Sequence, residues 1–337
     1  MFEVYKPSGR FGFSTFIYFL IGLVVTALLA VVYAYGLRYI PFIYISVLMT
    51  GAFGVALGFL GSLIVDMGHC RSVLLAMLIG LVLCVFGLAA KHYVQYGLWV
   101  GDVADNEIAY AIREGDIPKG QSESDREAIL KGFREAIAAQ VSYFGHFEER
   151  AKEGMVIGRR GNGAPMAGFF MYSIWVIELV IVLFFAWVMP VGSAKEPYSE
   201  KLGLWADETE EAMRLPVSSD EMVEQIKSAT TVEQLLEIPI PKSIDSQRYV
   251  LYSVHGVPGE EMEDAYLSVS LFVRSYDKDG EEKLDETELV KTAILTAAQR
   301  GQLLENASLM NEALEDYRNA LAEDAMAEDD EMDDGEV

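Results

Sequence analysis

The sequence predicts a membrane all-α region of four transmembrane helices, followed by a soluble α+β domain with a small antiparallel sheet and a long C-terminal helix. Three runs carry no Asp, Glu, Lys or Arg at all: residues 11–37, 39–65 and 72–90. A fourth apolar stretch, 167–189, holds a single carboxylate, Glu178. After Pro190 the composition turns polar and both strand and helix periodicities appear, which indicates a second domain.

Each apolar run is long enough to cross a bilayer. A hydrocarbon core about 30 Å thick needs roughly 20 helical residues, because only an internally hydrogen-bonded segment satisfies its backbone in lipid. We therefore expect spans at about 14–37, 40–65, 72–90 and 167–189, within a transmembrane region of 1–190. A buried core helix of a soluble protein typically has only about 10–14 uninterrupted apolar residues, and a cleavable signal peptide has a shorter apolar region.

Residues 91–165 form a long loop that we expect to be helical in part. The tetrapeptide 124–127 (Ser-Asp-Arg-Glu) has the spacing of a capping box. An apolar stripe at four-residue spacing follows it: Ile129, Phe133, Ile137 and Val141. This pattern predicts an amphipathic helix whose stripe faces the spans, the bilayer surface or its own loop, and packing within the protein is our expectation.

The soluble α+β domain is predicted at 195–322. Helix starts are expected at 218–221 (Ser-Ser-Asp-Glu) and 230–233 (Thr-Thr-Val-Glu), where hydroxyl residues precede a glutamate. Leu267, Val269, Leu271 and Val273 then alternate with other residues, which is the period of a strand. Residues 248–256 and 286–295 flank this segment as partner strands, so a small antiparallel meander is predicted.

A long helix is expected from Thr296, a capping residue with Gln299 three positions later. Its apolar residues follow a heptad-like seam: Leu303, Ala307, Met310, Leu314, Tyr317 and Leu321. Docking on the meander is preferred, and a coiled-coil homo-oligomer is the alternative. The remaining residues, 323–337, are dominated by Asp and Glu and are expected to form a disordered acidic tail.

The composition excludes several classes of function. A formal net charge of −25 disfavours nucleic-acid binding, which depends on Lys and Arg neutralising phosphates. With only two cysteines, one of them inside the third run, no disulfide framework or cysteine metal site is expected. The four histidines are scattered, so neither a metal site nor a cofactor is predicted.

Glu178 is the main candidate functional residue, because an ionised carboxylate near the middle of a span costs several kcal/mol unless it is paired. One interpretation is a hydrogen-bonded side chain that joins the helices; the other is an ion or proton path. Candidate partners lie on the other spans: Tyr33, Tyr44, Ser46, Thr50 and Ser62. No Lys, Arg or His falls in the middle of a run, which argues against a relay chain.

The second run contains Gly51, Gly54, Gly58 and Gly61. Small residues at this spacing let another helix backbone approach closely. We therefore predict that these glycines pack helices together.

Three features resemble a family of uncharacterised bacterial multi-pass membrane proteins: the run 39–44 (Tyr-Ile-Pro-Phe-Ile-Tyr), the glycine-rich second run, and 175–178 (Trp-Val-Ile-Glu). Residues 198–205 also resemble a Cys-x-x-Cys knuckle, with Ser199 and Leu202 in the cysteine positions. The resemblance implies the architecture and no activity. It also implies that this copy of the knuckle lacks its metal ligands.

The preferred hypothesis is a non-enzymatic membrane anchor or scaffold that presents 195–322 to a protein partner, since no catalytic constellation is visible. The alternative is a small transporter or channel that uses Glu178. Lipids are the other expected partners. Although other basic residues flank the opposite face, orientation is predicted from those that favour cytoplasmic N- and C-termini: Lys6, Arg10, Arg71, Lys195 and Lys201. The resemblance to bacterial proteins implies a bacterial inner membrane.

Overall fold

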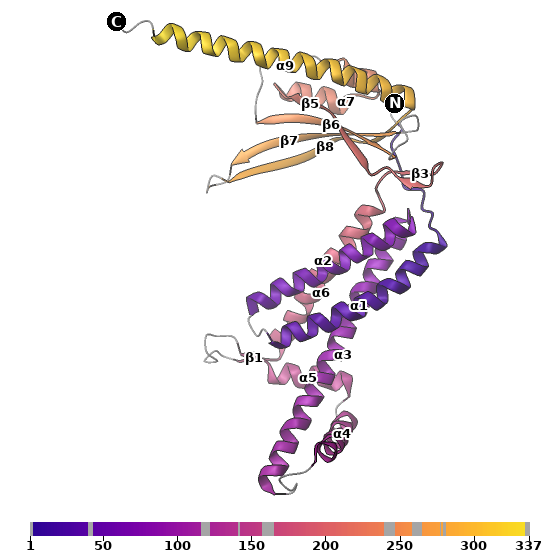
Figure 1. Cartoon of the computed structure of the whole chain (residues 1–337), viewed down its shortest axis with the longest axis vertical. Coiled ribbons are helices and arrows are strands. Elements are labelled where there is room, and N and C mark those ends of the chain that lie inside the picture. Colours follow the sequence, from indigo (N-terminus) through magenta and orange to yellow (C-terminus); the bar gives the residue numbers. More distant parts are fainter. Residues whose placement is uncertain are drawn as a thin grey trace. The chain divides into compact units, whose positions relative to one another are not determined.

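A computed structural model describes residues 3–39, 43–115, 122–140, 142–156, 165–238, 247–257, 265–276, 278 and 281–333. The chain divides into two compact units, which are treated separately below (Figure 1). The helical unit is Ser8–Ala194, and the mixed unit combines Met1–Pro7 with Lys195–Val337. Val141 of the amphipathic stripe and residues 334–337 of the acidic tail lie outside the described residues.

Four helices of the helical unit are long and apolar enough to cross a membrane. They are α1 (Phe13–Tyr39), α2 (Ile43–Gly68), α3 (Val73–Glu114) and α6 (Phe169–Ser193). Their most apolar windows have mean hydropathies between 2.0 and 2.9. The prediction of four long apolar helices is thus confirmed.

Helix α3 is longer than the sequence predicts. The third run of apolar residues ends at Ala90, but the helix continues to Glu114, where Gly115 caps it in the left-handed conformation with φ 93°. The charged residues after Ala90 do not end the helix, because nothing in its backbone prevents continuation and Lys91 is buried against the other helices. Lys91 therefore belongs to the bundle and does not begin a loop.

Two further helices, α4 (Glu123–Gln140) and α5 (Tyr143–Glu153), follow α3, and β1 (Met155–Val156) then pairs with β2 (Pro165–Met166). Helix α4 packs against α3, with Ile129, Phe133 and Ile137 half-buried. The predicted cap is wrong by two residues, since the Ser122 hydroxyl accepts a hydrogen bond from the Asp125 amide.

The mixed unit is built on an antiparallel sheet in the order β5-β6-β7-β8. Its strands are β5 (Glu208–Pro216), β6 (Arg248–Gly256), β7 (Ala265–Tyr276) and β8 (Glu282–Leu295). The predicted meander of three strands is present, and β5 adds a fourth that the sequence analysis missed. Its alternation is hidden because Glu210 and Glu211 are adjacent and both exposed, and because the register shifts between Glu211 and Met213.

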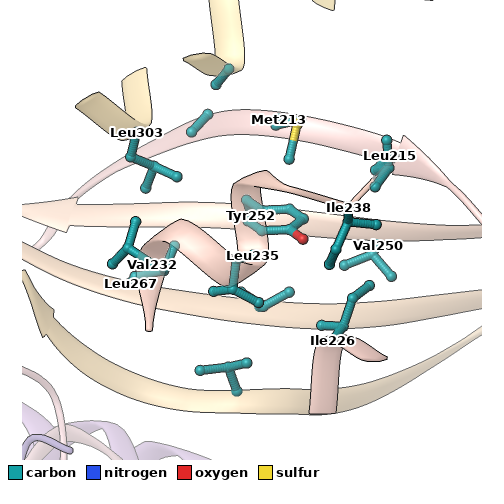
Figure 2. Close-up of a cluster of buried hydrophobic side chains, with 14 of the residues drawn as sticks. Met213, Leu215, Ile226, Val232, Leu235, Ile238, Val250, Tyr252, Leu267 and Leu303 are labelled. Atoms are coloured by element: carbon teal, nitrogen blue, oxygen red, sulfur yellow. The ribbon is translucent and has the colours of Figure 1, made fainter. Parts of the chain in front are cut away.

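One face of the sheet is covered by α7 (Asp220–Ser228), α8 (Val232–Leu236) and α9 (Ala297–Asp333). Figure 2 shows the core between them, where Tyr252 and Leu267 from the sheet meet Leu235 and Leu303 from the helices. Leu303, Ala307 and Leu314 of the predicted seam are buried there. The expectation that the last helix docks on the sheet is confirmed.

The three predicted helix starts are also confirmed. The hydroxyls of Ser219, Thr231 and Thr296 each accept a hydrogen bond from a backbone amide three residues later. Helix α9 continues to Asp333, past the point at residue 323 where the sequence predicts disorder. Once its first turns are docked, each further turn needs only propagation, which Ala, Glu and Met favour.

The N-terminal segment joins the mixed unit as a short addition to the sheet edge. Val4 bridges Ala293 of β8. The Tyr5 amide donates to the Thr292 carbonyl at 2.9 Å, and the Ile294 amide donates to the Glu3 carbonyl at 2.8 Å. The chain before α1 is therefore hydrogen-bonded to the chain after α6.

Candidate functional site

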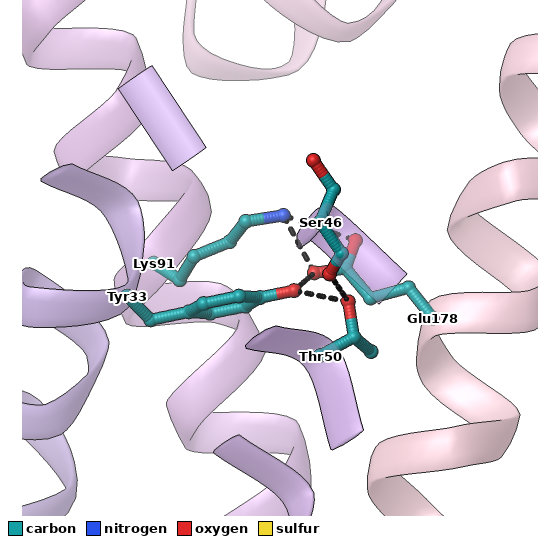
Figure 3. A network of polar contacts seen from close by, with 5 residues as sticks. All are labelled: Tyr33, Ser46, Thr50, Lys91 and Glu178. Atoms are coloured by element: carbon teal, nitrogen blue, oxygen red, sulfur yellow. Dashed lines mark hydrogen bonds and ion pairs between the residues drawn. The ribbon is translucent and has the colours of Figure 1, made fainter. Parts of the chain in front are cut away.

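The candidate site is a polar network inside the helical unit, to which each of the four long helices contributes one side chain (Figure 3). These residues are Tyr33 on α1, Thr50 on α2, Lys91 on α3 and Glu178 on α6. All four are buried, with Glu178 only 8% and Lys91 only 2% exposed.

Lys91 and Glu178 form the centre of the network. The Lys91 Nζ atom lies 2.7 Å from Glu178 Oε1 and 3.0 Å from Oε2, so the ammonium spans both carboxylate oxygens. The same ammonium lies 5.4 Å from the centre of the Tyr33 ring. A charge in an apolar interior is stable only when it is paired and hydrogen-bonded, and each of these ions satisfies that condition through the other.

Two hydroxyls complete the network. The Tyr33 hydroxyl donates to Glu178 Oε1 at 2.9 Å and lies 2.6 Å from the Thr50 hydroxyl. Thr50 in turn donates to the Ser46 carbonyl at 2.9 Å. Because each hydroxyl carries a single proton, Tyr33 and Thr50 can bond to each other only while one of them gives up its bond to Glu178 or to the Ser46 carbonyl.

The network lies against a cavity of about 800 Å³. Its apolar walls include Trp99, Trp175 and Ile177, and its polar lining includes Gln95 and His146. Arg38 and Asp102 also line it and form a two-pronged ion pair, with N–O distances of 2.8 and 2.6 Å. The volume falls within the usual range of small-molecule sites, about 300–1,000 Å³.

Helix α5 supplies one wall of the cavity through His146 and Arg150. The helix begins there because the Ser142 hydroxyl accepts a hydrogen bond from the Gly145 amide at 3.1 Å. The His146 ring lies 4.9 Å from the ring of Trp99, and Phe147 lies 5.3 Å from Trp175. Burial and the nearby Arg150 cation lower the pKa of His146 to about 4, so the imidazole is neutral at neutral pH.

Three of the four predicted packing glycines lie against α6. A Cβ atom on Gly54 would meet Val182 Cα at 3.1 Å, on Gly58 the Phe185 carbonyl oxygen at 2.5 Å, and on Gly61 a Pro190 ring carbon at 3.1 Å. Gly51 has no heavy atom within 4 Å of that position. The close approach of α2 and α6 brings Thr50 to the network that holds Glu178.

The sequence pointed to Glu178 and to Tyr33 and Thr50 among its partners, and the structure brings these three together. Ser46 takes part through its carbonyl, whereas Ser62 lies outside the network and the side chain of Tyr44 lies outside the described residues. No pattern in the sequence pointed to Lys91 as the cationic partner of Glu178. Lys91 directly follows the third apolar run, and no proline comes soon after it to end the helix. This position was the one feature from which its place in the helix could have been predicted.

The segment that resembles a metal knuckle forms a small hairpin, with β3 (Tyr198–Ser199) paired to β4 (Leu204–Trp205). The Ser199 hydroxyl accepts a hydrogen bond from the Leu202 amide at 3.2 Å, so these two residues shape the turn. Comparisons of the chain with protein-family models, curated proteins and solved structures find no match. The resemblance to bacterial multi-pass proteins stays a prediction.

Proposed function

We propose that this chain is an integral membrane protein whose helical unit binds a small molecule in the cavity beside the Lys91–Glu178 pair. The observation that carries the proposal is the buried ion pair at the wall of a cavity of about 800 Å³. Convergent polar groups in a largely apolar cavity are typical of ligand sites.

The outer faces of the four helices support the membrane location. Large apolar side chains are exposed along them, among them Val24 and Leu28 on α1 at 63% each and Leu48 on α2 at 72%. Soluble monomers rarely expose contiguous apolar patches larger than a few hundred Å². Lipid is the solvent that these faces fit.

The identity of the central residues supports a role beyond packing. A buried ion pair often contributes no more stability than apolar residues of the same size, because removing both charges from water costs about as much as their attraction returns. Charged residues inside membrane helices mark ligand or ion pathways by default. Lys91 and Glu178 offer the ligand both a donor and an acceptor.

Filling the cavity tests this proposal. Val47 lines the cavity and Val55 does not, although both lie on α2 and both are exposed. The test uses three probes that share a naphthalene ring and differ in charge: anionic 2-naphthoate, neutral 2-naphthalenemethanol and cationic 2-naphthylmethylammonium. We expect at least one to raise the thermal midpoint of the full chain and of Val55→Trp, but not of Val47→Trp. If no probe binds the full chain, or if both variants respond alike, the proposal fails.

Transport is a second candidate, favoured by the cation that pairs with Glu178. The apolar runs contain no cation in their middle, which disfavoured a proton relay, but Lys91 at the end of the third run is paired with Glu178. Glu178→Gln in proteoliposomes addresses this candidate directly. Proton or ion flux that falls to background would support transport, and flux equal to that of the unchanged chain would remove it.

The anchoring role predicted from the sequence concerns the mixed unit and is compatible with ligand binding in the helical unit. The face of the sheet opposite α7, α8 and α9 is the surface where a protein partner can bind. It carries the half-buried residues Leu251, Ser253 and Phe272. Pull-down from solubilised membranes with and without 195–337 tests this role. Identical sets of partners would remove it. The cytoplasmic, bacterial inner-membrane location also stays a prediction.

A further inference from the structure

We infer that the cavity takes a small organic anion with an apolar body, whose charged group binds Arg150 and whose hydrogen-bonding atom contacts His146. This inference rests on the proposed function and names the class of ligand.

Among the described residues, the charged side chains that line the cavity include one cation in excess. Arg38, Lys91 and Arg150 line it together with Asp102 and Glu178. Arg38 is paired with Asp102 and Lys91 with Glu178. Among the residues that the structure describes, Arg150 has no ion-pair partner. A monoanion balances this excess, and a guanidinium binds carboxylate or phosphate oxygens through two parallel hydrogen bonds.

His146 supplies the second observation. Its side chain is buried, with 5% of its surface exposed, and it lines the cavity. Its Nδ1 atom is buried and has no hydrogen-bond partner in the described part of the chain. A buried nitrogen without a partner is unfavourable, so a small rotation of the His146 ring that brings this nitrogen to a polar ligand atom in the cavity is favoured.

His146 and Arg150 can act on one molecule. They are four residues apart on α5, so their side chains lie on the same face of the helix. The His146 ring is neutral because burial and Arg150 lower its pKa to about 4. It therefore adds a directed hydrogen bond to the charge of Arg150 and no second charge.

The remaining walls determine the body of the ligand. Trp99, Trp175, Ile174 and Ile177 line the cavity and offer ring faces and branched aliphatic surface. Aromatic and apolar walls with few polar groups suit a ring or a short hydrocarbon chain. The same chemistry occurs in a free organic acid and in the headgroup region of an anionic lipid.

The test uses the full chain in phosphatidylcholine nanodiscs and the three naphthalene probes, followed by isothermal titration. A charge-assisted contact predicts that 2-naphthoate binds about tenfold more tightly than the neutral or cationic probe. Arg150→Gln should remove this preference, and Arg150→Lys should retain most of it. Lys152→Gln is the matched control, because Lys152 lies on the same helix, is exposed and does not line the cavity.

The outcomes separate the two proposals. Equal affinities for the three probes, or tighter binding of the cation, would overturn the anion preference while ligand binding stands. An unchanged preference in Arg150→Gln would overturn the role of Arg150. If no probe binds, both proposals fail. Repeating the titration in phosphatidylglycerol nanodiscs identifies the source: weaker binding of 2-naphthoate there supports a lipid as the competing anion, and unchanged binding supports a free acid.

Discussion

Lys91 and Glu178 are 87 residues apart in the chain, and their side chains meet at 2.7 Å with almost no exposure. The pair joins α3 to α6, Tyr33 on α1 donates to the same carboxylate, and Thr50 on α2 is bonded to the Tyr33 hydroxyl. One ion pair therefore connects the four long apolar helices. Several measurable consequences follow from this arrangement.

Removing one member of the pair should be far worse than removing both. In Lys91→Met or Glu178→Met the remaining charge is buried without a partner, at a cost of roughly 3–5 kcal/mol of unfolding free energy. In the double variant that charge is absent, so we expect much of the loss to be recovered. Unfolding in mixed micelles measures this double-mutant cycle. Additive losses in the double variant would contradict the interpretation of Lys91 and Glu178 as a coupled pair.

The contact between α2 and α6 should depend on Gly58 but not on Gly51. In Gly58→Ala the added carbon meets the Phe185 carbonyl oxygen at 2.5 Å and forces the backbones apart, whereas in Gly51→Ala it meets nothing within 4 Å. We expect the first variant to lose about 1–3 kcal/mol, the usual range for overpacking. The second should match the unchanged chain. Thermal unfolding in detergent compares them, and equal losses would refute the difference between the two positions.

Stability should fall as the pH drops from 6.5 towards 4, in a manner that depends on His146. The folded chain holds the pKa of His146 at about 4, below its ordinary value of 6.5, because of burial and the Arg150 cation. His92 on α3 interacts electrostatically with His146, and Lys91 lines the same cavity. Between pH 6.5 and 4 the unfolded chain binds the His146 proton more tightly than the folded chain does. The stability that the neutral His146 ring contributes is therefore present above pH 6.5 and is lost on acidification.

Comparing the unchanged chain with His146→Phe isolates this effect, because carboxylates titrate in both. We expect the thermal midpoint of the unchanged chain to decline more steeply across this interval. Parallel pH profiles for the two proteins would show that His146 does not titrate as described.

Local signals in the sequence were sufficient for most of the fold. Ser219, Thr231 and Thr296 start their helices where predicted, because a capping hydroxyl bonds to an amide only three residues away. Strand β6 matches the predicted 248–256, since one of its faces is buried and the alternation is clear. Strand β5 was missed because glutamates occupy both faces of an exposed edge.

The site was only half predictable, because its pairing depends on how the helices are rotated against one another. Glu178 was conspicuous as a lone charge in an apolar run. Lys91 follows the end of another run and has the position of an ordinary flanking residue. Its burial depends on the close approach of α3 to α6, where Gly80 lies against the Ala186 carbonyl. That long-range contact has no local signature in the sequence.

Docking of α9 should depend on the buried Leu303 and not on the exposed Leu309. Leu303 is fully buried in the core of the mixed unit, whereas Leu309 on the same helix is 61% exposed. Leu303→Ala should lower the unfolding free energy by roughly 2–5 kcal/mol, the usual range for such a cavity, and Leu309→Ala should leave it unchanged. Chemical denaturation followed by circular dichroism measures both. An undisturbed Leu303→Ala protein would contradict the docking of α9.

The two ends of the chain should lie on one side of the membrane. Glu3 and Tyr5 are hydrogen-bonded to β8, which follows α6 in the sequence, so the segments before α1 and after α6 share one compartment. An even number of spans has the same consequence. Tags at Met1 and at Val337 should therefore become accessible together when sealed cells or inverted vesicles are treated with a protease. Cleavage of one tag while the other is protected would overturn either the pairing of the N-terminal segment or the number of spans.

The variant Val4→Pro distinguishes these two causes, because proline weakens the pairing of the N-terminal segment with β8 and leaves the spans unchanged. If that variant still shows both tags on one side, the number of spans alone fixes the topology, and if its tags separate, the edge pairing is required.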